Sequence, residues 1–105
     1  MVGGARALVE NSAPGALSAD FAACMAFDDA RGVAARVICP VTVIAGLGDK
    51  MTPASAGRRL ASSLSNVELV ELAATGHMMM FESPRDVRRI LLDRVVSTIE
   101  EKEEE

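Results

Sequence analysis

Two short apolar runs separated by one helix-length segment limit the fold of this chain more than any other feature. Residues 37–46 form a run rich in Val and Ile, and residues 67–72 form a second run with polar residues at intervals. Both runs are typical of β-strands, the first buried on two faces and the second more exposed. Thr52 and Pro53 are typical of a helix start, so we expect a helix over residues 53–64. A strand, helix, strand order predicts two parallel strands joined by a crossover.

Helix patterns also flank the two predicted strands. Residues 18–31 begin with a serine that can cap a helix, and the segment that follows Ser83 and Pro84 carries apolar side chains at helical spacing. The first ten residues are expected to form a further short helix. We therefore predict an α/β fold in the order helix, strand, helix, strand, helix. The acidic C-terminal residues oppose the helix dipole, so the last turn of the final helix is expected to fray.

The composition indicates a small globular protein and argues against two classes of partner. The chain has 105 residues, of which 50% are hydrophobic and 25% charged, and its formal net charge is −4. It has no basic stripe with interleaved aromatic residues, which nucleic-acid modules usually carry. No apolar run approaches the roughly 20 residues that a membrane helix needs, and no signal-peptide pattern opens the chain. We expect a cytoplasmic protein that binds neither nucleic acid nor membrane.

The two cysteines do not suggest a metal site. Cys24 and Cys39 lack the CxxC spacing of metal ligands, and no cluster of histidines accompanies them. We expect no metal and no cofactor. Two small buried thiols in a reducing compartment are the favoured interpretation, with a disulfide as the open alternative.

One carboxylate and one imidazole follow the two predicted strands. Asp49 comes just after the first strand, and His77, the only histidine, lies in the loop after the second. The carboxyl ends of parallel strands meet at one edge of a sheet, where sites of α/β proteins collect. A carboxylate that accepts a hydrogen bond from one imidazole nitrogen leaves the other nitrogen free to act as a base. A histidine that merely belongs to a turn is the competing interpretation.

Two motifs in this order resemble the C-terminal segment of the α/β-hydrolase family. CPVTVIAGLGDKMTP contains G-x-x-D-x-x-x-P after the first strand, and VELVELAATGHMMMFESP contains G-H followed by an acidic residue and proline after the second. The resemblance implies that these are the last two strands of the family fold. It also implies that Asp49 is the acid and His77 the base of a catalytic triad. Met51 and Met78 would then lie near the acyl or leaving-group pocket, although methionines in such a loop also serve as flexible core filler.

The nucleophile that this family requires is absent from the sequence. Such enzymes order their triad as Ser, Asp, His, with the serine in a G-x-S-x-G turn, and no such turn precedes Asp49. Ser12 lacks small residues two positions to either side, and Ser18, between Ala16 and Asp20, fits a helix cap better. The resemblance therefore implies a truncated, C-terminal portion of a serine-type hydrolase for ester or amide-like bonds, inactive as an isolated chain. A stand-alone enzyme that uses Ser55 or a cysteine is the least favoured interpretation.

We expect three segments, with a cap-like helical segment at residues 1–34, a hydrolase βαβα segment at 35–100 and an acidic tail at 101–105. The first predicted strand is apolar on both faces, but the chain offers it one neighbour, and an unpaired strand edge invites association. The expected partner is a second copy or a complementary hydrolase chain, with a small-molecule substrate if the site is completed. The alternative is a non-catalytic, hydrolase-derived domain that self-associates or binds a partner.

Overall fold

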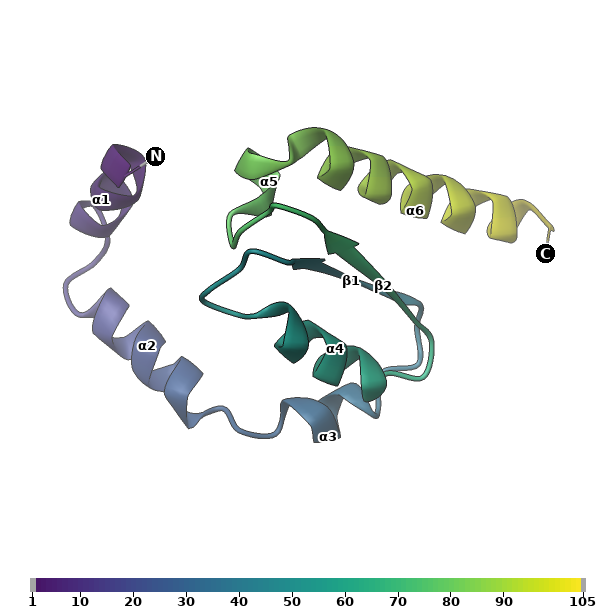
Figure 1. Cartoon of the computed structure of the whole chain (residues 1–105). Helices are drawn as coiled ribbons and strands as arrows, with labels where there is room; N and C mark the ends of the chain where they lie inside the picture. Colours follow the sequence, from purple (N-terminus) through teal and green to yellow (C-terminus); the bar gives the residue numbers. More distant parts are fainter. Residues whose placement is uncertain (1, 105) are drawn as a thin grey trace. The chain divides into compact units, whose positions relative to one another are not determined.

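The chain forms two compact units. A computed structural model describes residues 2–104 (Figure 1). The units are Met1–Ala30 and Arg31–Glu105. The segment boundaries predicted from the sequence are not tested by this division and stay predictions.

The first unit is helical. It contains α1 (Val2–Glu10) and α2 (Ala16–Ala26), which confirms the short N-terminal helix. The prediction that one helix runs over residues 18–31 was wrong at its C-terminal end. The backbone of Phe27 is extended, with φ −83° and ψ 114°, and helix resumes only at α3 (Ala30–Ala34). Two aspartates separate these helices, and aspartate favours positions just before a helix over positions inside one.

A two-stranded parallel sheet lies at the centre of the second unit. Strands β1 (Val41–Gly46) and β2 (Val67–Leu72) pair in a register that matches Val41 with Val67 and Gly46 with Leu72. The parallel pairing confirms the prediction from the strand, helix, strand order. Strand β1 is shorter than the apolar run because Pro40 has no N–H to donate to a ladder. Within residues 2–104 the sheet contains two strands, so each has one edge without a strand partner.

Helices cover both faces of this sheet (Figure 1). On one side is α4 (Ala54–Ser62), and on the other is α6 (Pro84–Glu104), preceded by the short α5 (Met79–Glu82). A two-pronged ion pair between Arg58 and Glu71 joins α4 to β2, with N–O distances of 2.6 and 2.9 Å. Arg94 on α6 pairs with Glu68 on β2. The apolar core of the described chain is small and consists of Ala34, Ala45, Ala61, Leu72 and Ile90.

Two expectations from the sequence were wrong: that the last turn of the final helix is not formed, and that the two cysteines are buried. The last turn of α6 is helical to Glu104, which is consistent with the good helix propensity of glutamate and with Lys102, whose charge offsets part of the unfavourable charge. Cys24 and Cys39 are free and exposed, not buried. No helix in residues 2–104 is both long enough and apolar enough to span a bilayer.

Candidate active site

The loops after β1 and β2 are joined by backbone hydrogen bonds. Leu47 N–H donates to the carbonyl oxygen of Leu72, and Gly48 N–H donates to that of Thr75, both at 2.9 Å. Gly46 allows this approach, because a Cβ atom there would lie 2.4 Å from the carbonyl oxygen of Thr75. The two loops therefore meet at the carboxyl edge of the sheet, as their positions after parallel strands predict.

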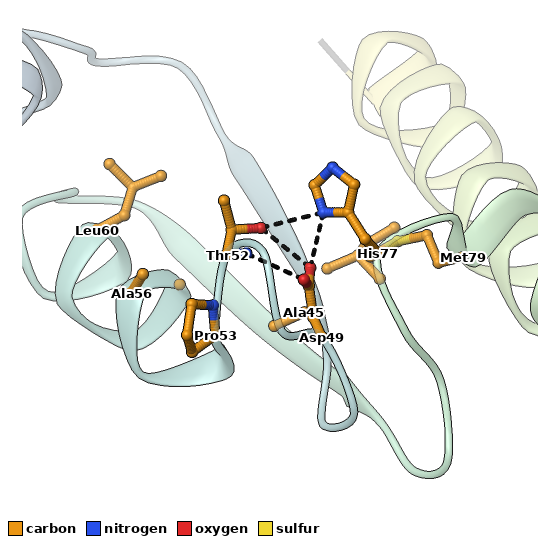
Figure 2. A pocket seen from close by; sticks show the side chains of 10 residues that line it. Ala45, Asp49, Thr52, Pro53, Ala56, Leu60, His77 and Met79 are labelled. Carbon is orange, nitrogen blue, oxygen red and sulfur yellow. Dashed lines mark hydrogen bonds and ion pairs between the residues drawn. The ribbon is translucent and has the colours of Figure 1, made fainter. Parts of the chain in front are cut away.

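This contact brings Asp49 and His77 into a hydrogen-bonded pair. Asp49 Oδ2 lies 2.9 Å from His77 Nδ1 (Figure 2). The aspartate side chain is 4% exposed and that of the histidine 41%, so the carboxylate is shielded while the imidazole reaches solvent. The second ring nitrogen of His77 lies on the side of the ring away from Asp49 (Figure 2). A buried carboxylate behind an accessible imidazole is the arrangement that acid–base chemistry requires.

Thr52 belongs to the same cluster, which the sequence analysis missed. Its hydroxyl donates to Asp49 Oδ2 at 2.9 Å and lies 3.3 Å from His77 Nδ1. The predicted role of Thr52 as a helix cap was wrong, because Pro53 holds the position before α4 and no side chain caps that helix. The spacing could have revealed this role, since a threonine three residues after an aspartate can bond back to it.

The hydrogen bonds around Asp49 fix the tautomer of His77. The single hydroxyl proton of Thr52 is used on Asp49 Oδ2, so toward Nδ1 the threonine oxygen can only accept. An ionised carboxylate also only accepts. Both neighbours of Nδ1 are therefore acceptors, which assigns the proton of neutral His77 to Nδ1 and leaves Nε2 with a free lone pair.

Opposing influences act on the pKa of Asp49. Burial, the largest single influence, raises it by penalising the charged form. Hydrogen bonds lower it, and the strongest of them comes from the backbone N–H of Thr52, followed by those of the His77 ring, the Thr52 hydroxyl and the Met51 N–H. The bonds together outweigh burial and bring the pKa from 3.8 to about 2. Asp49 is thus a carboxylate throughout the neutral range.

This lowered pKa predicts how acid affects stability. Because the pKa is lower in the folded chain than its ordinary value, the carboxylate stabilises the fold fully above about pH 4 and loses this effect as the pH falls through about 2. We expect the difference in unfolding free energy between the native chain and Asp49→Asn to shrink from pH 5 to pH 2, as measured by urea unfolding. The other carboxylates titrate in both proteins, so their contributions cancel in the difference between the two unfolding free energies. A difference that stays constant over this range would contradict the prediction.

Two further contacts hold the His77 loop. Gly76 N–H donates to the carboxylate of Glu82 at 3.1 Å, and the hydroxyls of Thr75 and Ser83 lie 2.6 Å apart. Thr75 is 1% exposed. Glu82 thus has a structural role, since its carboxylate satisfies a backbone donor next to the histidine.

A pocket of about 400 Å³ adjoins the pair. Its polar lining comes from Asp49, Thr52 and His77, and its other walls come from β1, α4 and Met79 (Figure 2). Neither Met51 nor Met78 lines this pocket, and they are 75% and 40% exposed. Whether they contact a substrate stays a prediction. No group of three or more His, Cys, Asp or Glu side chains that could hold a metal ion occurs in the part of the chain that the structure describes.

Comparisons with known proteins identify the fold. No protein-family model matches the chain. A pimeloyl-[acyl-carrier protein] methyl ester esterase of Chromobacterium violaceum is 36% identical over 67 residues, which are 64% of this chain and 26% of the esterase. The crystal structure of BpoC of Mycobacterium tuberculosis H37Rv, described as a non-heme bromoperoxidase, matches 64% of this chain with a TM-score of 0.61 and 30% sequence identity.

The chain contains part of an α/β-hydrolase fold. Both relatives are of this family, which confirms the resemblance and the predicted fold class. The chain spans about a quarter of the length of each relative. The matched part of the α/β-hydrolase fold is thus a minor share of a complete enzyme of this kind.

Proposed function

We propose that this chain supplies the acid, Asp49, and the base, His77, of a serine-type hydrolase site. The single observation that carries the proposal is the 2.9 Å contact between Asp49 Oδ2 and His77 Nδ1 beside an open pocket. The serine and the oxyanion hole come from residues outside these 105, either on the same polypeptide or on a partner chain. The esterase relationship supports a carboxylic ester as the substrate class.

The chemistry follows from the free lone pair on His77 Nε2. It takes the proton of the serine hydroxyl as the serine oxygen bonds to the ester carbonyl carbon. The resulting imidazolium is stabilised by the ionised Asp49, and it then gives its proton to the departing alkoxide. A water molecule repeats the sequence on the acyl-enzyme, which releases the carboxylic acid and frees the serine.

A non-catalytic domain that binds a partner is the second candidate function. It is favoured by the large apolar side chains that the second unit leaves exposed, among them Ile38 at 89% and Phe81 at 63%. These surfaces also suit association with the missing part of a hydrolase fold, so apolar exposure alone does not separate the two functions. Catalysis in a completed site does separate them.

A hybrid esterase tests the proposed function. In this hybrid, the matching segment of the Chromobacterium violaceum esterase is replaced by the corresponding residues of this chain. We expect the hybrid to hydrolyse p-nitrophenyl acetate and to label with a fluorophosphonate probe. His77→Ala should lower kcat by about 10⁶-fold, because the base is lost, and the remaining oxyanion hole and binding contacts leave about 10³- to 10⁴-fold over the uncatalysed rate.

Arg59→Ala provides the matched control. Arg59 is an exposed residue of α4 that does not line the pocket, so its removal should leave kcat within twofold. A hybrid that has native-like circular dichroism and no activity above the uncatalysed rate would refute the proposed function. Equal activity of the hybrid and its His77→Ala variant would refute it as well.

A further inference from the structure

Helix α6 has an apolar stripe on the side that faces away from the sheet. Successive residues of an α-helix are rotated by about 100°, so Leu92, Val95, Val96 and Ile99 lie within about 100° of one another on the helix surface. Each of the four is 50% to 56% exposed. Ile90 is buried, and Leu91, Arg94 and Thr98 line a hollow together with Pro40 and Thr42 at the start of β1. The stripe is therefore separate from the side that packs on the sheet.

The charges on α6 are divided between its two ends. Arg85, Arg88 and Arg89 lie in its first two turns, and Glu100, Glu101, Glu103 and Glu104 lie near its end. Arg85, Arg88 and Leu92 line one hollow on this surface, which makes the basic end continuous with the stripe. Arg89 contacts Asp86 at 3.0 Å, whereas no ion pair within residues 2–104 involves Arg85, Arg88 or those four glutamates.

We propose that α6 is a self-association surface on which a second copy of this chain docks in antiparallel orientation. A two-fold axis through Val96 sets each Arg89 opposite Glu103 of the other copy, because both lie seven residues from Val96. Arg85 and Arg88 lie on the same side of α6 as the stripe and add to the basic end that faces the acidic end of the other copy. A two-fold interface needs one self-complementary surface, and the apolar stripe with opposite charges at its ends is such a surface.

The charges on α6 favour a second copy of this chain as the partner and an antiparallel orientation of the two helices. A parallel pair of these helices would set arginine against arginine and glutamate against glutamate, which is unfavourable. A wholly acidic or wholly basic partner would match one end of α6 and be repelled at the other. A second copy in antiparallel orientation matches both ends and covers the stripe.

Charge reversal tests the proposal by sedimentation velocity over a range of protein concentrations. The native chain should dimerise, and its dissociation constant should rise between 50 mM and 500 mM salt, because salt screens the end charges. R88E/R89E and E103R/E104R should each raise the dissociation constant about 100-fold, since the attraction between basic and acidic ends becomes repulsion at both ends of each symmetric dimer. R36E/R59E reverses two exposed arginines outside α6 and should leave the constant unchanged.

Two recovery experiments separate this interface from unfolding of the variants. The two charge-reversed variants should form a mixed dimer with each other, because acidic and basic ends then match at both sites. The chain that carries all four substitutions should recover the native dissociation constant. A monomer at every concentration, or a dimer that is insensitive to reversal at both ends, would overturn the proposal. So would two folded variants, verified by circular dichroism, that fail to form the mixed dimer.

Discussion

Asp49→Asn is expected to lower kcat of the hybrid esterase about 10⁴-fold, although the substitution changes one atom of a buried side chain. The carboxylate accepts hydrogen bonds from His77 Nδ1 and from the Thr52 hydroxyl. An asparagine amide can instead donate to Nδ1, which favours the tautomer whose proton is on Nε2. The base then has no lone pair for the serine proton, and no negative charge stabilises the imidazolium.

The tautomer can be read on the chain itself, because it contains one histidine. We expect two-bond nitrogen–proton correlations in NMR spectra at neutral pH to show the proton on Nδ1 in the native chain and on Nε2 in Asp49→Asn. This readout separates a loss of tautomer control from a loss of folding. Retention of kcat within tenfold in the variant, or an unchanged tautomer, would contradict the role that we assign to Asp49.

Gly46→Ala is expected to have the largest effect on stability, a loss of about 3 kcal/mol in the free energy of unfolding. The added Cβ would lie 2.4 Å from the carbonyl oxygen of Thr75 and 2.8 Å from that of Gly76. Both are backbone atoms, so no side-chain rotation relieves the clash. The loop after β2 must move, and the bond from Gly48 N–H to Thr75 must lengthen or break.

Gly57→Ala is the matched control for this substitution. Its added Cβ would lie 3.3 Å from the Ala45 side chain, a tight contact that a small shift of α4 can relieve, and alanine favours helix over glycine. We expect its free energy of unfolding to stay within about 1 kcal/mol of the native value in urea titrations. A Gly46→Ala protein as stable as Gly57→Ala would show that the loops are not held as close together as the structure has them.

The sheet and the acid–base pair could be predicted from the sequence because short-range patterns specify them. Residues 67–72 were predicted as a strand and form β2 with the same bounds. The apolar run begins and ends at these residues, and polar or small residues flank it on both sides. The nearness of Asp49 and His77 follows from strand order alone, because parallel neighbours bring their carboxyl ends together. Only the 2.9 Å separation and the burial of the carboxylate required coordinates.

The remaining features depend on competition between contacts that a sequence does not rank. The Thr52 hydroxyl could cap α4 or bond to Asp49, and the position of the His77 ring beside it favours the second choice. Met79, not Met51 or Met78, lines the pocket, and the sequence pattern does not indicate which methionine faces it. The break after Ala26 lies at Phe27, whose extended backbone helix propensity alone does not reveal, although the two aspartates after it favour a new helix start.

The hydrogen-bonded pair also has a kinetic consequence. Asp49 and His77 are 28 residues apart, and the paired strand residues Val41 and Val67 are separated by almost the same distance along the chain. Closing this loop costs conformational entropy before any parallel sheet contact compensates for it, so parallel pairing is intrinsically slow. We therefore expect the acid and base to come together in the same slow step that forms the sheet. The NMR signal of the His77 imidazole should then follow formation of the folded state during refolding.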